Sequence, residues 1–166
     1  MTNHKRQKTK TMSNKRTELK VSAIRNGTVI DHIPADNTFQ VLKMLNLDES
    51  NRQIYFGTNL DSKKFGKKGI IKISGKFFEE EEISKIALVA PSATLIEIKD
   101  YDVSKKESVR LPETVEKIVK CFNPKCVTNI QQIPTKFRVT KDHKGNMKLA
   151  CHYCEKTMGE NHIEFL

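Results

Sequence analysis

The four cysteines of the chain fall into two close pairs, and this spacing constrains the fold more than any other feature. Four residues separate Cys121 from Cys126, two separate Cys151 from Cys154, and 24 residues lie between the pairs. Each pair fits one tight turn, so all four thiolates can point at a common centre. Four thiolates in a tetrahedron suit zinc and leave no open coordination position. The spacing therefore predicts one structural zinc ion, and it disfavours four unrelated buried cysteines.

The segment between the two cysteine pairs has the pattern of a small β domain. Short alternating stretches at 136–139 and 147–149 flank Lys144-Gly145-Asn146, which is typical of a turn. The stretch Leu111-Pro112-Glu113 precedes this region and is typical of a linker. We therefore expect residues 111–166 to form a zinc-ribbon-like, all-β domain.

The positive charge of the chain is concentrated at its N-terminus. The formal net charge is +10, and residues 1–20 hold seven basic residues against one acid, a net +6. Residues 1–18 are polar and are predicted to be a disordered basic tail. The sequence contains neither a run of about 20 apolar residues nor a secretory h-region. We therefore expect no membrane contact and a cytoplasmic location, where thiols stay reduced and bind metals rather than form disulfides.

Residues 19–110 have the pattern of a sheet with two helices. Asn26-Gly27 predicts a hairpin over 19–33, and the apolar spacing of 38–47 predicts a helix. Four consecutive acids at 79–82 suit the first turn of a second helix, because they complement the helix dipole, and Pro91 ends it. Further strands are predicted at 54–60, 68–74, 93–99 and 101–105. This order predicts an α+β, ferredoxin-like antiparallel sheet with two helices, plus an additional N-terminal hairpin.

Several strings of the sequence closely resemble the regulatory chain of aspartate carbamoyltransferase. They include Gly27-Thr-Val-Ile-Asp31-His32-Ile33-Pro34, Ala90-Pro-Ser-Ala-Thr94, Tyr101-Asp-Val103, Cys121-x-Asn-Pro-x-Cys126 and Cys151-x-Tyr-Cys-Glu-Lys156. The resemblance covers residues 19 to about 158. It implies an allosteric nucleotide-binding domain at 19–110 and a zinc domain at 111–166 that docks on the catalytic chain.

The same resemblance implies a non-catalytic role in pyrimidine biosynthesis. In this family CTP inhibits the holoenzyme, ATP activates it, and UTP can reinforce CTP. Regulatory chains pair through their allosteric domains, and three such dimers bridge two catalytic trimers. We therefore expect this chain to form a homodimer and to associate with an aspartate carbamoyltransferase catalytic chain.

The resemblance also implies which residues contact the nucleotide. Backbone groups near Ala23-Ile24 and Tyr101 are expected at the base edge, with Val29 and Val103 as apolar walls. Asp31 and Lys72 are expected near the ribose and base, and His32 and Lys106 near the phosphates. Val21 and Ile98 complete the expected set. Without the resemblance, an Asp-His pair is usually a polar turn, and a lone Lys on a strand is usually solvated.

Three positions bear on how this chain differs from its family or docks on its partner. Ile96 stands where the family commonly has an Asn on the phosphate side, which affects affinity or the response to particular nucleotides. Lys125 stands between the first two cysteines, near the expected catalytic-chain interface. Lys156, next to the last cysteine, is a candidate ion-pair donor to that chain, although an exposed Lys usually contributes little.

Two other classes of protein fit the sequence less well. A zinc-ribbon nucleic-acid-binding protein would account for the basic tail. Against it, the residues beyond 20 carry only +4, and the chain lacks a set of aromatics for base stacking. An enzyme is disfavoured because the sequence has no phosphate-binding glycine loop and no nucleophile-elbow motif.

Overall fold

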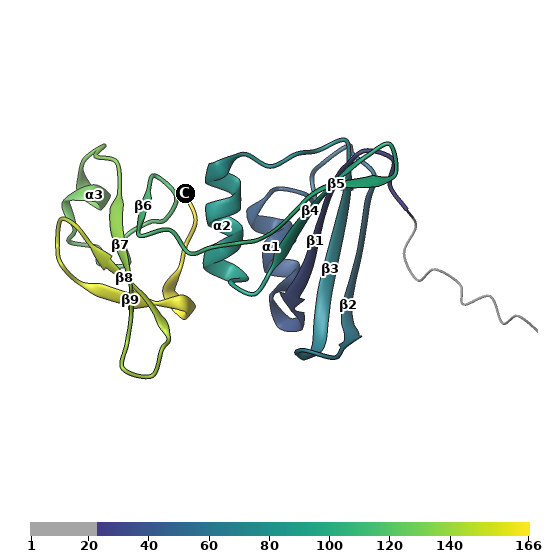
Figure 1. Ribbon diagram of the computed structural model, residues 1–166. Coiled ribbons are helices and arrows are strands. Elements are labelled where there is room, and N and C mark those ends of the chain that lie inside the picture. The colour runs from purple at the N-terminus through teal and green to yellow at the C-terminus, as the bar shows by residue number, and fades with distance from the viewer. Residues whose placement is uncertain (1–22) are drawn as a thin grey trace, which may run out of the picture.

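The computed structural model describes residues 23–166, and Figure 1 shows that they form two sheets with helices between them. The predicted tail at 1–18 and the expected contact residue Val21 lie outside the described residues. No helix in the described part is long and apolar enough to span a membrane.

The first sheet has five antiparallel strands in the order β2-β3-β1-β4-β5. Without β5, this is the strand order of the ferredoxin-like fold, so the predicted α+β fold class is confirmed. The elements are β1 (Gly27–Pro34), η1 (Ala35–Asn37), α1 (Thr38–Met44), β2 (Ile54–Ser62), β3 (Gly66–Ser74), α2 (Glu80–Val89), β4 (Thr94–Lys99) and β5 (Asp102–Ser108).

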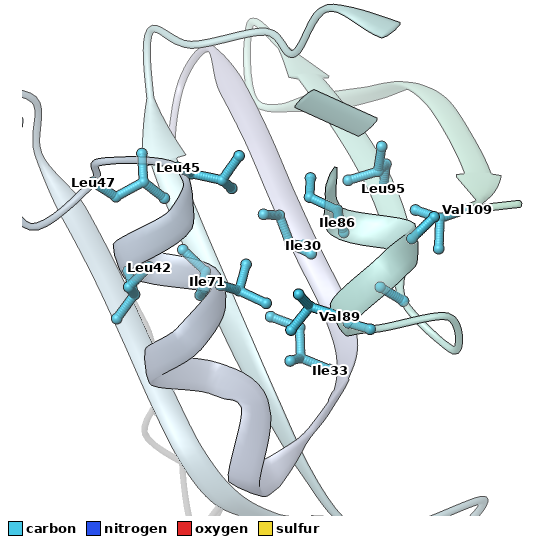
Figure 2. Close-up of a cluster of buried hydrophobic side chains, with 14 of the residues drawn as sticks. Ile30, Ile33, Leu42, Leu45, Leu47, Ile71, Ile86, Val89, Leu95 and Val109 are labelled. Atoms are coloured by element: carbon cyan, nitrogen blue, oxygen red, sulfur yellow. The ribbon is translucent and has the colours of Figure 1, made fainter. Parts of the chain in front are cut away.

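Both helices cover the same face of this sheet (Figure 1). The core between them is aliphatic: Ile30, Ile71 and Leu95 come from three neighbouring strands, and Leu42 and Ile86 come from the two helices (Figure 2). Successive residues of a strand point to opposite faces. The neighbours of the core residues therefore lie on the opposite, helix-free face, which we call the open face.

Both helices have recognisable ends. The Glu79 side chain accepts from the backbone of Glu82, and Glu82 returns the contact to the Glu79 N–H at 3.0 Å, which is a capping box. Helix α1 ends at Met44 rather than at the predicted residue 47. The reason is that Asn46 takes a left-handed φ of 51°, and the Leu47 N–H bonds to the Leu42 carbonyl, which closes a Schellman motif.

The predicted N-terminal hairpin is wrong. Strand β1 lies between β3 and β4, so both of its edges are already paired, and residues 23–26 are not a strand. Gly27 is needed for a different reason. Its φ is +141°, and a Cβ there would lie 2.0 Å from the Ile73 carbonyl oxygen. The glycine permits close approach of β1 and β3, and the fifth strand is β5.

The second sheet has four antiparallel strands in the order β6-β7-β8-β9. Its elements are β6 (Thr114–Glu116), α3 (Val127–Ile130), β7 (Lys136–Lys141), β8 (Met147–Cys151), β9 (Thr157–Gly159) and η2 (Glu160–His162). The predicted strands at 136–139 and 147–149 are confirmed, whereas β6 and β9 were not predicted. The turn between β7 and β8 is organised by Asp142, which accepts from the N–H groups of Lys144 and Asn146 at 2.9 Å.

Helix α2 lies between the two sheets (Figure 1). Ile86, Ala87 and Val89 belong to the core of the first sheet, whereas Leu88, only 2% exposed, is buried in the core of the second. Leu111 and Phe165 pack against both cores. One short helix therefore contributes to both hydrophobic cores.

Candidate functional site: a tetrathiolate centre and the open sheet face

The four cysteine sulfurs converge on one point. All four Sγ atoms lie within 4.8 Å of one another, and three of the four residues are buried. The Sγ atoms of Cys121 and Cys154 are 3.7 Å apart, and those of Cys126 and Cys151 are 3.8 Å apart. A disulfide requires a separation of about 2.05 Å, so all four cysteines are free. The predicted convergence is therefore present in the fold.

Hydrogen bonds from neighbouring residues fix both cysteine loops. The Asn129 side-chain amide donates to the carbonyls of Cys121 and Asn123, at 2.7 and 2.8 Å. The Cys126 N–H donates to the Asn123 carbonyl at 2.9 Å. In the second loop, Glu155 adopts a left-handed φ of 59° and donates its N–H to the Cys151 carbonyl. The thiols are thus held in place by the protein backbone.

A bound cation would stabilise the thiolate forms of these four cysteines. Burial raises the pKa of both Cys121 and Cys151 above the usual thiol value. Burial acts in the same direction on Cys154, but hydrogen bonding from Asn123 and from the Lys156 backbone brings the pKa of Cys154 down to about 7. Four thiolates this close repel one another unless a metal ion neutralises them, and a metal deprotonates its thiol ligands.

The geometry fits zinc. A tetrahedral site with Zn–S bonds of about 2.3 Å has sulfur–sulfur edges of about 3.8 Å, which matches the two short separations. Four protein ligands saturate such a site. It therefore suits a structural zinc ion, held by Cys121, Cys126, Cys151 and Cys154, and leaves no position for a reacting water.

The open face of the first sheet brings together residues from four strands. Val29 on β1 is in register with Lys72 on β3 and with Ile96 on β4, and Ile96 is in register with Lys106 on β5. Since paired residues share a face, these four form one row. In the next row, Ile98 pairs with Val103. The face thus combines an apolar floor with lysines from two strands.

One edge of this face is closed by the turn between β4 and β5. Asp100 and Tyr101 have φ values of 50° and 69°, as a two-residue type I′ turn requires. The Tyr101 N–H donates to the Arg25 carbonyl at 2.9 Å, and Arg25 forms an ion pair with Asp100 at 3.2 Å. These bonds place the 23–26 segment against the turn, so Ala23-Ile24 and Tyr101, expected at the base edge, lie in adjoining segments.

Asp31 fixes the conformation of His32. The carboxylate Oδ1 of Asp31 accepts from the His32 N–H at 2.7 Å, and it also lies 2.7 Å from Lys68 Nζ. Ser92 Oγ donates to the His32 carbonyl at 2.9 Å, which holds His32 at a φ of 58°. Burial works to raise the pKa of Asp31, but the bonds from Lys68 and the His32 backbone, together with the charges of Lys68 and His32, lower it below the usual value.

A pocket of about 430 Å³ opens beside His32. Thr94 in its wall pairs with Asp31 on β1 and with Ser108 on β5, so this wall continues the rows of the open face. The lining residues come from the β2–β3 turn, from the connection between α2 and β4, and from β1, β4 and β5: His32, Lys64, Ser92, Thr94, Lys106, Glu107 and Ser108.

The structure thus gathers most of the expected contact residues on one face. Lys72, Val29, Ile98, Val103 and Lys106 lie on it, Asp31 and His32 lie at its end, and Ala23, Ile24 and Tyr101 border it. Lys64, Lys68 and Ser92 were not predicted from the sequence. Gly66, which is typical of a turn, lies between the two lysines and is the signal that could have identified their segment. The contact roles of the whole set stay predictions.

Comparison with known proteins gives matches over nearly the whole chain. One family model, described as the allosteric domain of the aspartate carbamoyltransferase regulatory chain, matches residues 19–110. A second, described as the metal binding domain of that chain, matches residues 113–164.

Curated relatives agree with these matches. The aspartate carbamoyltransferase regulatory chain of Phocaeicola vulgatus is 48% identical over 155 residues, which cover 93% of this chain and 99% of the relative. The regulatory chain of Bacteroides thetaiotaomicron is 49% identical and covers 93% and 100%. That of the archaeon Pyrococcus horikoshii is 49% identical over 148 residues and covers 88% and 96%.

Proposed function

The chain belongs to the family of aspartate carbamoyltransferase regulatory chains, and from this premise we propose that it binds CTP and ATP on the open face of its first sheet. In this proposal the chain catalyses no reaction. It relays nucleotide levels to the catalytic chains of an enzyme of pyrimidine biosynthesis, with UTP as a further effector. Because the chain belongs to this family, we prefer this function to the alternative of a zinc-ribbon protein that binds nucleic acid.

One observation supports the nucleotide site above all others: a continuous row across the open face in which two apolar side chains lie between two lysines. Val29, Ile96 and Ile98 form a flat apolar floor suited to a base. Lys106 and His32 would bind the phosphates, through an ammonium group and a ring N–H respectively, and Lys72 would lie near the ribose and base. The backbone at 23–24 and at Tyr101 would read the base edge. Cytosine and adenine both carry an exocyclic amine, so one backbone acceptor would serve both.

We propose that function divides with the fold. Residues 19–110 would sense nucleotides, and residues 111–166 would dock on the catalytic chain. The side chains of Phe122, Ile130 and Tyr153 are exposed on and near the metal loops, at 40–69%. Exposed apolar and aromatic side chains of this kind mark protein interfaces. Lys125 and Lys156 lie beside them in the sequence and would add charge to that surface.

The zinc ion would hold this docking surface in shape. When bound, the metal cross-links the two cysteine loops and supplies much of the folding free energy of the second domain. Residues of the chain itself set the loop conformations and fill the core. Asn129 and Glu155 set the loop conformations, and Phe137 and Leu149 fill the core behind them. A tetrathiolate centre suits the reducing cytoplasm.

Signal transfer would use α2. An effector shifts an equilibrium only by binding one state better than the other, typically with 1–3 kcal/mol of coupling. CTP and ATP differ in base size and would seat the sheet differently. Helix α2 packs on that sheet through Ile86 and Val89 and is buried in the second domain through Leu88. A shift of the sheet would therefore move the metal domain and bias the catalytic trimers.

The homodimer expected for this chain would use the edge of β2. Within residues 23–166 this nine-residue strand pairs only with β3, so its other edge has no partner in that part of the chain. Next to it, the exposed rings of Phe39 and Phe56 contact each other at 5.7 Å. An unpaired edge beside exposed aromatics favours pairing with a second copy.

Binding measurements on the full chain test the nucleotide site, and reconstitution tests regulation. Isothermal titration with CTP and ATP should give one site per chain and mutual competition. Mixing the chain with its cognate catalytic trimer should make the aspartate saturation curve depend on both nucleotides. Flat kinetics with both nucleotides would contradict the proposal.

A further inference from the structure

The pocket beside His32 has the composition of a phosphate site. Three hydroxyl groups line it, from Ser92, Thr94 and Ser108, together with two lysines, Lys64 and Lys106. Ser92 donates to the His32 carbonyl, which leaves Thr94 and Ser108 as donors to a ligand. Among the lining residues in the described part of the chain, the only carboxylate is that of Glu107, which is paired with Lys105 at 2.7 Å. The pocket therefore offers hydrogen-bond donors and an excess of positive charge.

The cations of this pocket are available to a ligand. Lys67, Lys68 and Lys105 nearby all form ion pairs with carboxylates. Between residues 23 and 166, by contrast, no ion pair involves Lys64 or Lys106. The Nδ1 atom of His32 is buried without a hydrogen-bond partner and lies 3.6 Å from Asp31 Oδ2, too far for a hydrogen bond.

Lys64 and His32 both contact the ring of Phe65, which lies in the turn between β2 and β3. The Phe65 ring meets the His32 ring edge-on, with the ring centroids 5.9 Å apart, and Lys64 Nζ lies 5.1 Å from the Phe65 centroid. The Phe65 N–H donates to Ser62 Oγ, and the Lys67 N–H donates to the Phe65 carbonyl at 2.8 Å. The turn is thus hydrogen-bonded, and it places Lys64 in the lining of the pocket that also contains His32.

Resting on the nucleotide site proposed above, we propose that Lys64 binds the terminal phosphate of a nucleoside triphosphate in this pocket, opposite Lys106. The middle of β4 has an apolar residue, Ile96, on the open face and so offers no side-chain donor there. Lysines bind phosphate as point charges from flexible stems. We therefore place the terminal phosphate at the rim of the pocket, which is lined by Lys64 from the β2–β3 turn and by Thr94, the first residue of β4.

The test is a phosphate-length series on the full-length chain. Isothermal titration with CTP, CDP and CMP is compared for the wild type, Lys64→Ala and Lys63→Ala. Lys63 is the matched control: it is the exposed neighbour in the same turn and does not line the pocket. Thermal unfolding and zinc content check that both variants fold.

Lys64→Ala should weaken CTP binding about tenfold, the effect of one charge-assisted hydrogen bond, and should change CMP binding less than about twofold. Lys63→Ala should leave the whole series nearly unchanged. An equal loss for CTP and CMP, or equal effects of the two variants, would overturn the role of Lys64 while leaving the nucleotide site intact. A wild-type chain that binds none of the three would instead refute the nucleotide site itself.

Discussion

Lys68 Nζ lies 2.7 Å from Oδ1 of Asp31, and both side chains are largely buried, at 20% and 16% exposure. The same oxygen accepts the His32 N–H. Asp31 therefore links β3 to the left-handed turn that presents His32 to the pocket. Its structural role is to position His32, and this role is compatible with a contact to ribose through its second oxygen.

Asp31→Asn should loosen this turn. The variant loses the ion pair with Lys68 and weakens the bond to the His32 N–H, which should destabilise the chain by about 1–2 kcal/mol after allowance for solvent screening. CTP affinity should fall because His32 is no longer held. Urea unfolding and calorimetric titration at pH 7 measure the two effects. Unchanged affinity would show that His32 does not need Asp31.

The contribution of Asp31 should depend on pH in one direction. Its pKa is lower in the folded chain than the ordinary value of 3.8. A carboxyl group whose pKa is lowered by folding stabilises the folded state fully at pH values above its unfolded pKa. This stabilisation is lost as the pH falls through the pKa of the folded state. The stability difference between wild type and Asp31→Asn should therefore be constant from pH 5 to pH 8 and shrink below about pH 4. Metal loss at low pH affects both proteins and cancels in this difference.

Removing the metal should unfold one domain only. The two cores are built separately around the two sheets, and all four cysteines belong to the second. We expect one zinc per chain by elemental analysis and none in Cys151→Ser. Hydrogen exchange should then lose protection over 114–159, while 27–108 keep theirs. Protection that persists across β7 and β8 without metal would contradict a structural role for the ion.

Gly27→Ala should be far more damaging than the same change at Gly66. Both residues have positive φ, but a Cβ at Gly27 meets the Ile73 carbonyl, whereas a Cβ at Gly66 meets no atom within 4 Å. We expect a loss of about 3 kcal/mol or more at Gly27 and about 1 kcal/mol at Gly66. Denaturant titrations followed by circular dichroism compare them, and equal losses would contradict the close approach of β1 and β3.

Local patterns in the sequence were enough to predict most of this fold. Glu79 and Glu82 predicted the start of α2 because capping is a local interaction. The paired cysteines predicted the metal centre because each close pair can be placed by one short loop. Lys136–Val139 and Met147–Leu149 predicted two strands because alternation is local too.

Features that depend on tertiary pairing were not accessible in the same way. Asn26-Gly27 has the pattern of a hairpin turn, but only the pairing of β1 with both β3 and β4 shows that the glycine permits strand contact instead. Leu111 lies in the predicted linker, and only the fold shows that it packs against both cores. Leu88 was missed, because its neighbours Ala87 and Val89 face a different core.

Leu88 provides the test of signal transfer. Leu88→Ala removes a fully buried side chain from the core of the metal domain and should cost about 2–4 kcal/mol. In the holoenzyme it should also weaken the effect of CTP and ATP on aspartate saturation, because α2 loses its packing contact with the core of the second domain. Nucleotide affinity of the free chain should stay close to wild type, since Leu88 lies on the helix side of the sheet.

Val89→Ala is the matched control for this prediction. Val89 is the next residue of α2. It is only 6% exposed and belongs to the core of the first sheet instead. Its truncation should lower the stability of the first domain (residues 19–110) by about 1–3 kcal/mol. It should preserve the packing of α2 against the metal domain, because Leu88 is unchanged. If the two variants reduced nucleotide regulation equally, the loss would follow from general destabilisation. A selective loss of regulation in Leu88→Ala would assign the coupling to Leu88, the α2 side chain that is buried in the core of the metal domain.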